Sequence, residues 1–266
     1  MAADSIFAQL LLPAPMKISA RQLDDALRSL FPDLQLNCSS GGDPDAINPG
    51  LIEVGGCMLA LMSMPFPVPA DGSFDAALAH RFIWSDADRA VEAHRAHVIV
   101  TSFGRVGPSL ASKVECARVV TFVCAALAQI GKALGLYWKG SQHLVSPQQL
   151  AASAASCAAG ERLPTDVWVR PYWAQEAGKN PRNTFATRGL SFFSGFELET
   201  DFLPIEPGQL LGGLYAIVQS AVDGSMILKP NETIGLEGFA TLRTRYSPNG
   251  SLGLGPTLML ELAVGS

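Results

Sequence analysis

A helical repeat that runs directly into an apolar strand organises the middle of the sequence. Trp84, Ala87 and Val91 follow the i, i+3, i+7 spacing of one helix face, and Ser85 can cap this helix through its side-chain oxygen. His97–Phe103 then has the β-branched richness of a strand that is covered on both sides. The pattern therefore predicts an amphipathic helix followed by a core strand.

Shorter hydrophobic runs on the N-terminal side predict several strands and one further helix. Ser19 opens this helix, which ends near Leu30. The expected strands are Ser5–Leu12, Leu34–Cys38, Leu51–Val54 and Cys57–Met64. Apart from one additional short strand, the order with the helix and strand described above is β-α-β-β-α-β, which is that of the split βαβ or ferredoxin-like arrangement.

A long apolar segment follows, and we expect it to form a helix from Pro108 to about Ala133. It is apolar on several faces, which is typical of a helix buried between layers. Its longest apolar run, Val119–Ile130, is shorter than the ~20 residues that span a bilayer. We therefore predict a core helix and no membrane segment.

The rest of the chain predicts a second set of strands around one helix. Phe196–Phe202 alternates strictly between apolar or Thr positions and acidic positions, as a strand does, and a helix begins at Glu206. Further strands are expected at Asp166–Ala174, Phe185–Phe193, Met226–Leu228, Ala240–Tyr246 and Thr257–Val264.

These elements predict an α+β protein with antiparallel or mixed sheets and helices packed on one face. Residues 1–140 form an N-terminal βαββαβ-like half plus the long helix, and residues 141–266 form a C-terminal α+β half. In this prediction two ferredoxin-like halves are joined by the long buried helix and pack as one compact unit.

Composition narrows the class of protein. Of 266 residues, 48% are hydrophobic and 16% are charged, so a sizeable core can form. The net charge of −5 lacks the basic excess that neutralises nucleic-acid phosphates. The five cysteines are scattered without a C-x-x-C, as in reduced cytoplasmic proteins, and no secretory signal is evident. We expect a cytoplasmic protein that binds neither nucleic acid nor membrane.

Two histidines, His94 and His97, have a spacing that can supply two imidazoles to a metal ion. No third ligand stands at a recognisable spacing, and His80 lies too far along the chain to join them. Histidines held by hydrogen bonds in the core are the competing interpretation. The alternative function, a metal- or small-ligand-binding enzyme, depends on this pair.

Three carboxylates, Glu197, Glu199 and Asp201, lie on one side of the alternating strand. Such a row can bind a divalent cation, act as an acid/base pair or meet a basic partner; a solvated strand face is the competing interpretation. The sequence contains no G-x-S-x-G, P-loop, dinucleotide-binding or H-E-x-x-H motif. We therefore predict no catalytic residue, no metal and no cofactor.

Two long polar loops, Ser39–Pro49 and Gln175–Thr184, are the places where binding is expected. Aromatic and charged residues on and beside such loops are typical of protein interfaces. The predicted partner-binding residues are Asp43, Asp45, Trp173, Glu176 and Arg182. The alternative is that the tryptophan is a core strand residue.

Several segments, taken in order, resemble a bacterial family known as domain of unknown function 4261. The matching segments are Phe7–Pro13, Leu61–Pro69, Trp84, His94–Val100, Leu136–Trp138, Gly189–Glu199 and Leu228–Gly235. The ordered set covers nearly the whole chain, although no single segment is diagnostic. The family brings no established catalytic residues to these positions.

The resemblance implies a role in toxin defence. Similar proteins occur beside polymorphic toxins, including effectors of type VI secretion systems, and some act as their immunity proteins. The first hypothesis is therefore a cytoplasmic immunity protein that binds one cognate toxin, such as a nuclease, and blocks its active site. A third hypothesis, after the enzyme, is an interaction protein without a toxin, and gene neighbourhood separates it from the first.

Overall fold

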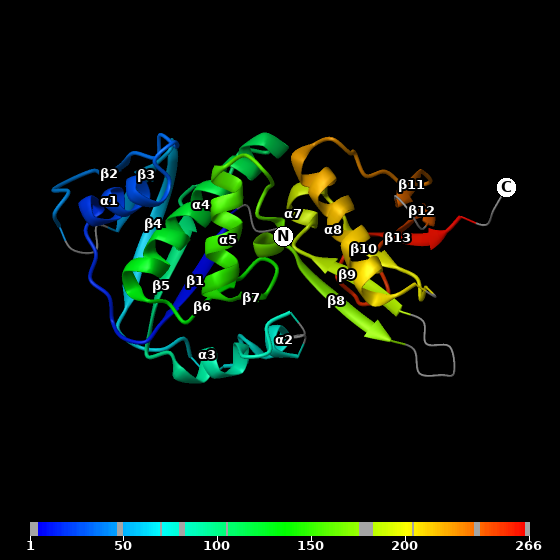
Figure 1. Ribbon diagram of the computed structural model, residues 1–266, viewed down its shortest axis with the longest axis horizontal. Helices are drawn as coiled ribbons and strands as arrows, with labels where there is room; N and C mark the ends of the chain where they lie inside the picture. The colour runs from blue at the N-terminus through cyan, green and yellow to red at the C-terminus, as the bar shows by residue number, and fades with distance from the viewer. Residues whose placement is uncertain are drawn as a thin grey trace. The chain divides into compact units, whose positions relative to one another are not determined.

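The computed structural model describes residues 5–46, 50–69, 71–79, 83–104, 106–175, 183–203, 205–236 and 240–263. The chain divides into two compact units, Met1–Trp168 and Val169–Ser266 (Figure 1). The fold class is α+β, as predicted, with one sheet in each unit. The sequence placed the boundary near residue 140, whereas the contacts place it after Trp168. That the two parts pack as one body stays a prediction.

The first unit contains a seven-stranded sheet in the order β2-β3-β4-β5-β1-β6-β7. All of its strand pairs are antiparallel. In chain order its elements are β1 (Phe7–Leu12), α1 (Ala20–Leu30), β2 (Cys38–Ser40), β3 (Leu51–Val54), β4 (Cys57–Met64), α2 (Asp75–Leu78), α3 (Ala87–Ala93), β5 (Ala96–Ser102), α4 (Leu110–Gly131), β6 (Gly135–Trp138), β7 (His143–Val145), α5 (Pro147–Ala158) and α6 (Thr165–Trp168).

The predicted ferredoxin-like arrangement is wrong for this sheet. A split βαβ unit joins parallel strands through a helix. Here β1 pairs antiparallel with β5 on one side and with β6 on the other. The predicted order of helices and strands along the chain is correct in outline. The pairing of the strands does not follow from that order, because it depends on contacts between residues that are far apart in sequence.

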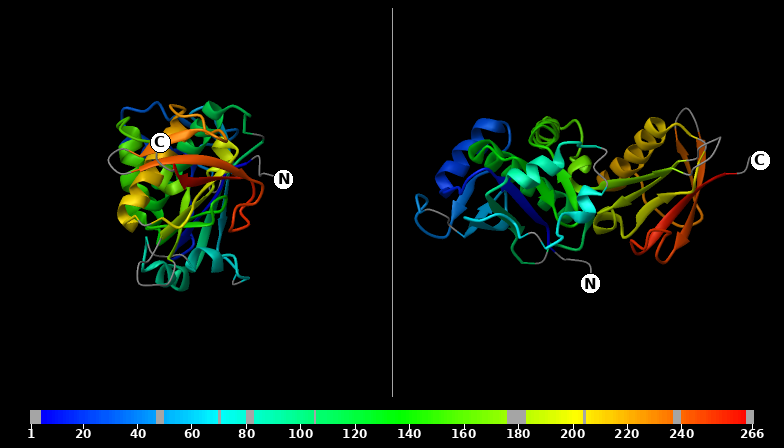
Figure 2. Two further views of the ribbon diagram at one scale, coloured as in Figure 1. Left: turned by 90° about the vertical axis from the view of Figure 1, so that its right-hand side faces the viewer. Right: turned by 90° about the horizontal axis from the view of Figure 1, so that it is seen from below.

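Helices cover both faces of the first sheet, not one. Along β1, Leu10 and Leu12 face α4, whereas Leu11 points the other way into a cluster with Phe74 of the α2 segment and Ala87 of α3. α1, α4 and α5 therefore form one layer. The short helices α2 and α3 lie on the opposite side, against β7 and β6 (Figures 1 and 2).

The long helix α4 is the centre of the first unit and does not join two halves. It packs against α1, α5 and strands β1, β4 and β5. Residues Val119 to Leu127 are all buried, consistent with the predicted core helix. By length and composition alone α4 could cross a membrane, but 61% of its most apolar window is buried inside the protein.

The second unit contains a six-stranded mixed sheet in the order β11-β12-β13-β10-β9-β8. β10 and β13 are parallel, with α8 in the connection between them, and the other pairs are antiparallel. This order is not ferredoxin-like either. Its elements are β8 (Arg170–Gln175), β9 (Asn183–Arg188), α7 (Ser191–Ser194), β10 (Glu197–Thr200), α8 (Pro207–Asp223), β11 (Thr233–Leu236), β12 (Ala240–Ser247) and β13 (Thr257–Leu262).

Candidate partner-binding surface

One half of the first sheet presents apolar side chains to solvent. The exposed fractions are 40% for Leu51 on β3, 41% and 39% for Met58 and Met62 on β4, and 59% for Phe103 just after β5. Ile99 of β5 is half-buried beside them. We call these five residues the open face.

Strand register places the open-face residues next to one another. Met62 is paired with Ile99 across β4 and β5. Phe103 donates its backbone N–H to the carbonyl oxygen of Met58 (2.8 Å). Leu51 is paired with Ala60, which lies between the two methionines on the same side of β4. The side chains therefore form one surface across three strands.

The other half of this sheet face is covered by the segment that carries α2 and α3. Tyr137 of β6 packs edge-on against Phe74 with the ring centroids 5.0 Å apart, and its hydroxyl donates to the carbonyl oxygen of Ser73 (2.9 Å). The covering helices contact β6 and β7. The open face is thus the part of the sheet beyond their reach.

The sequence of β4 does not distinguish its exposed side from its buried side. Leu59 and Leu61 are buried at 0% and 4% exposure toward α4, and Met58 and Met62 lie on the other side. All four residues are apolar, so the run reads as a buried strand. The methionines are exposed because the chain covers only one end of the sheet, which the local pattern does not encode.

One of the predicted partner-binding residues, Asp43, borders the open face, and Asp45 lies next to it on the same connection. Asp43 and Leu51 line the same hollow of about 390 Å³ beside the β2–β3 connection. Asp45 donates its backbone N–H to the Asp43 carboxylate (2.9 Å) and forms an exposed ion pair with Arg21 of α1 (2.7 Å). Glu53, also exposed, is paired with Met58. Acidic side chains therefore stand at the rim of the apolar surface.

The other three predicted residues belong to the second unit. Trp173 on β8 is half-buried, and its indole N–H donates to the side-chain oxygen of Asn183 (3.2 Å). The same oxygen accepts from Gln175 (3.1 Å). Glu176 and Arg182 lie outside the described residues. Trp173 is held by its own strand pair, which favours a structural role for it.

Both histidines, His94 and His97, form hydrogen bonds with the backbone. His94 is buried; its Nε2 accepts from the Val68 N–H (2.9 Å) and its Nδ1 donates to the carbonyl oxygen of Val91. Neither ring nitrogen of His94 is left for a metal. His97 is also buried, and its Nδ1 donates to the carbonyl oxygen of Phe66 (2.9 Å). Through their hydrogen bonds to Val68 and Phe66, the two histidines fix the proline-rich segment that follows β4.

The carboxylate row does not form a solvated face. Glu197 and Glu199 are each only 3% exposed, whereas Asp201 is exposed. Glu199 accepts from the backbone N–H of Ser251 (2.9 Å) and from the Ser251 hydroxyl. Burial raises the pKa of Glu199 despite these bonds. The alternating pattern identified this strand, but it did not show that Glu197 and Glu199 on its acidic side are buried.

Glu197 is surrounded by hydrogen-bond donors. Its Oε1 accepts from the backbone N–H groups of Gly189 (2.8 Å) and Ser191 (3.2 Å) and from the Ser191 hydroxyl (2.7 Å). Its Oε2 accepts from the Leu190 N–H (3.1 Å) and the Thr187 hydroxyl (2.8 Å). These bonds hold the turn between β9 and α7, so Glu197 has a structural role.

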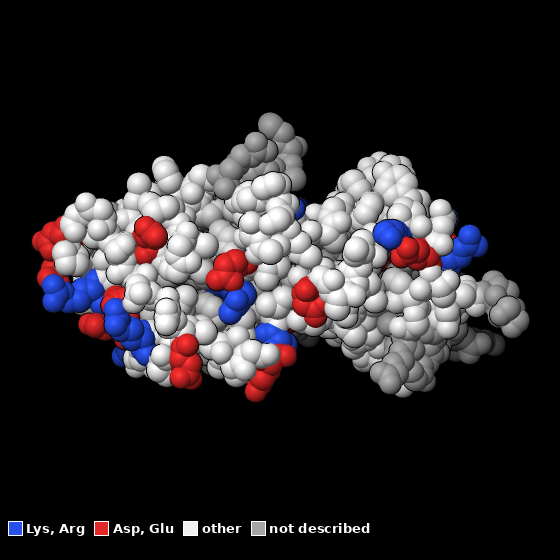
Figure 3. Space-filling view, turned by 90° about the horizontal axis from the view of Figure 1, so that it is seen from above, with Lys and Arg blue, Asp and Glu red and all other residues white. Residues whose placement is uncertain are grey.

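Charged side chains of both signs are mixed on the face of the molecule that Figure 3 shows. On the face drawn in Figure 3, Lys and Arg side chains lie beside Asp and Glu side chains and do not gather in a basic stripe. Among the described residues, no group of three or more His, Cys, Asp or Glu side chains is placed to hold a metal ion.

Comparison with protein-family models, curated proteins and solved structures gives no match for this chain. The functional argument therefore depends on the open face and its rim.

Proposed function

We propose that this chain is an immunity protein that binds a cognate secreted toxin in the cytoplasm and blocks its active site. The open face is the observation that carries the proposal. Contiguous exposed apolar side chains mark interaction sites on proteins. Methionine and aromatic residues such as Met58, Met62 and Phe103 are enriched where interfaces are fully buried. The predicted residues Trp173, Glu176 and Arg182 are not needed in this surface.

The rim of the open face favours a basic partner. Asp43 lies beside Leu51, and Glu53 lies beside Met58. The whole chain carries a net charge of −5. An apolar centre with an acidic rim would bury well against a basic toxin, such as a nuclease, and opposite charges would speed the encounter.

The resemblance to the domain of unknown function 4261 family supports the choice of partner. Similar proteins occur beside polymorphic toxins and some neutralise them. An immunity protein needs a stable scaffold and a surface complementary to the toxin, without chemistry of its own. Both ring nitrogens of His94 form hydrogen bonds with the backbone, which favours the immunity proposal over the competing enzyme hypothesis.

Co-expression tests the proposal directly. Each protein encoded beside this gene is expressed in a bacterial host, and any that arrests growth is expressed again together with this chain. We expect this chain to restore growth and to form a stoichiometric complex with that toxin. If none of the growth-arresting neighbours is neutralised or bound, the immunity function is refuted and an interaction protein without a toxin is favoured.

A matched pair of variants tests the surface separately. Met58→Asp with Met62→Asp places two charges at the centre of the open face, and we expect toxin affinity to fall at least about 30-fold, as for loss of an interface hot spot. Ile227→Asp makes the same kind of change at an exposed apolar residue (71%) of the second unit. Equal affinities for the two variants would exclude the open face while leaving neutralisation itself intact.

A further inference from the structure

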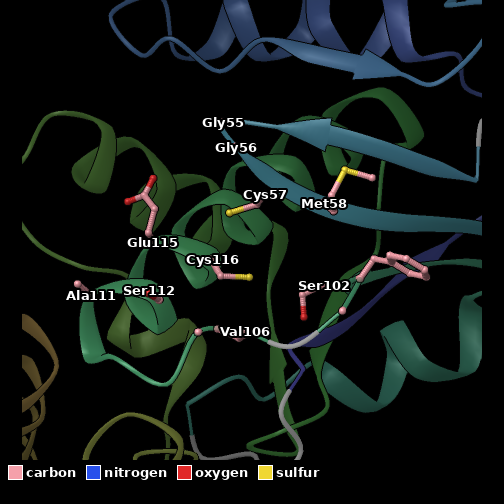
Figure 4. A pocket seen from close by; sticks show the side chains of 13 residues that line it. Gly55, Gly56, Cys57, Met58, Ser102, Val106, Ala111, Ser112, Glu115 and Cys116 are labelled. Carbon is pink, nitrogen blue, oxygen red and sulfur yellow. The ribbon is translucent and has the colours of Figure 1, made fainter.

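A second feature is a pocket at one end of the first sheet, and Met58 and Phe103 of the open face form part of its lining. It has a volume of about 580 Å³, within the roughly 300–1,000 Å³ of small-molecule sites. The β3–β4 turn, the end of β5 and the first turns of α4 line it (Figure 4). Glycines such as Gly55, Gly56 and Gly104 leave its wall free of side chains on two sides.

Two free cysteines meet in this pocket. Cys57 begins β4 and is half-buried, and Cys116 of α4 is buried at 7% exposure. The two thiols lie close enough to change each other's pKa, and the side chain of Ser102, which lines the same pocket, acts on the pKa of Cys116. Figure 4 shows both side chains lining the same space, from opposite elements. The more accessible thiol thus has a second thiol directly behind it.

The environment makes the two thiols chemically unequal. Interaction with the Cys116 side chain lowers the pKa of Cys57, and the same interaction together with burial raises the pKa of Cys116. Burial raises the pKa of Cys38, another half-buried cysteine, to about 12. Because the thiolate is the nucleophile, Cys57 is the cysteine favoured to react first.

We propose that Cys57 and Cys116 form a thiol–disulfide exchange site for a low-molecular-weight disulfide such as oxidised glutathione. The Cys57 thiolate attacks one sulfur of the reagent, whose S–S bond breaks and releases one thiol. Cys116 then attacks the Cys57 sulfur of the mixed disulfide and releases the second thiol. The two cysteines are oxidised by two electrons, and the reagent is reduced to two thiols that carry the two protons.

The reaction links two elements that are far apart in sequence. A bond between Cys57 and Cys116 would fix the start of β4 to α4. Met58 of the open face follows Cys57 directly, so the oxidised pair would restrain the strand that carries this surface. The exchange reaction itself can be measured without the toxin.

Mass spectrometry of the full chain tests this site. The reduced protein is incubated with oxidised glutathione at neutral pH, quenched in acid, and measured intact and after non-reducing digestion. We expect a mass loss of about 2 Da, from two hydrogens, and a linked peptide pair containing Cys57 and Cys116. Dithiothreitol should restore the starting mass. This measurement on the unmodified sequence needs no variant to fold.

Variants assign the order of the two steps. Cys116→Ser should stop at the mixed disulfide on Cys57, with a gain of about 305 Da, because the resolving thiol is gone. Cys57→Ser should give neither product at this pair. Cys38→Ser is the matched control and should behave as the unchanged protein. First reaction at Cys38, or a mixed disulfide on Cys57 that Cys116 never resolves in the unchanged protein, would overturn the proposal.

Discussion

Glu197→Gln is the substitution that most sharply tests how the second unit is held together. The glutamate carboxylate is 3% exposed and accepts five hydrogen bonds from the β9–α7 turn. Glutamine has nearly the same shape but replaces one acceptor oxygen with an NH₂ donor. The change therefore alters hydrogen bonding with little change in volume.

The loss of stability depends on which of the hydrogen-bond partners can adapt to the amide group. If the glutamine oxygen takes the place of Oε1, it keeps the donors from Gly189 and Ser191. Its NH₂ group then faces the Leu190 N–H and the Thr187 hydroxyl. The hydroxyl can rotate and accept, but the Leu190 N–H is left without an acceptor, which costs about 1–3 kcal/mol in a buried site. The bonds that remain also lose their charge assistance, partly offset by the easier burial of a neutral group.

The net loss in free energy of unfolding of the second unit should be about 2–4 kcal/mol. For a urea m-value of about 2 kcal/mol/M, the midpoint falls by about 1–2 M. Trp173, on β8 of the same sheet, contributes to the tryptophan fluorescence that follows this transition, and the three tryptophans of the first unit give a common background in both variants. Glu206→Gln is the control: Glu206 is exposed and accepts from Gln209 at the start of α8 (3.0 Å), so its loss should stay within about 1 kcal/mol. Equal midpoints for the two variants would refute the structural role of Glu197.

Two further predictions concern close packing and pH. In Gly212→Ala, in α8, the added Cβ meets no atom within 4 Å, and the protein should be stabilised by about 0.5–1 kcal/mol. In Gly135→Ala the added Cβ lies 2.8 Å from the Trp84 ring, and the protein should be destabilised by about 1–3 kcal/mol. Thermal unfolding midpoints that shift in the same direction for both variants would contradict this reasoning. Burial lowers the pKa of His97, so the unfolded state binds more protons below about pH 6.5; stability is fully present above that pH and falls as the pH drops toward the folded-state pKa. Urea midpoints should therefore decrease more between pH 7.5 and 5.5 in the unchanged protein than in His97→Gln, and parallel decreases would exclude His97 as the source.

Local patterns predicted the elements that are stabilised locally. Ser19 forms a capping box with Gln22, and the helix begins and ends close to the expected residues. The strand ending in Ser102 and the long helix α4 were also found from periodicity alone. In each case the signal lies in neighbouring residues, either a cap or a repeat of apolar positions.

Elements that depend on turns or distant partners were predicted less well. Phe185–Phe193 was expected as one strand, but the chain turns at Gly189, whose φ is 103°, and continues into α7. The turn is held by Glu197, which comes later in the chain. Similarly, Met226–Leu228 was expected as a strand and is not one, whereas Thr233–Leu236 pairs with β12. Strand pairing decides these cases, and a single strand does not encode its partner.

The same dependence on distant contacts explains why the sequence predicts a partner-binding surface on the loops, whereas the structure favours one on a sheet. Polar loops are recognisable without knowing the fold, so Asp43 and Trp173 could be named in advance. Exposure of Met58 and Met62 depends on where α2 and α3 end on the opposite half of the sheet, which is a tertiary property. An apolar strand is a core signal in sequence, and it becomes a binding signal only when the structure leaves it uncovered. The residues that matter most for the proposed partner are therefore those that a pattern alone assigns to the interior.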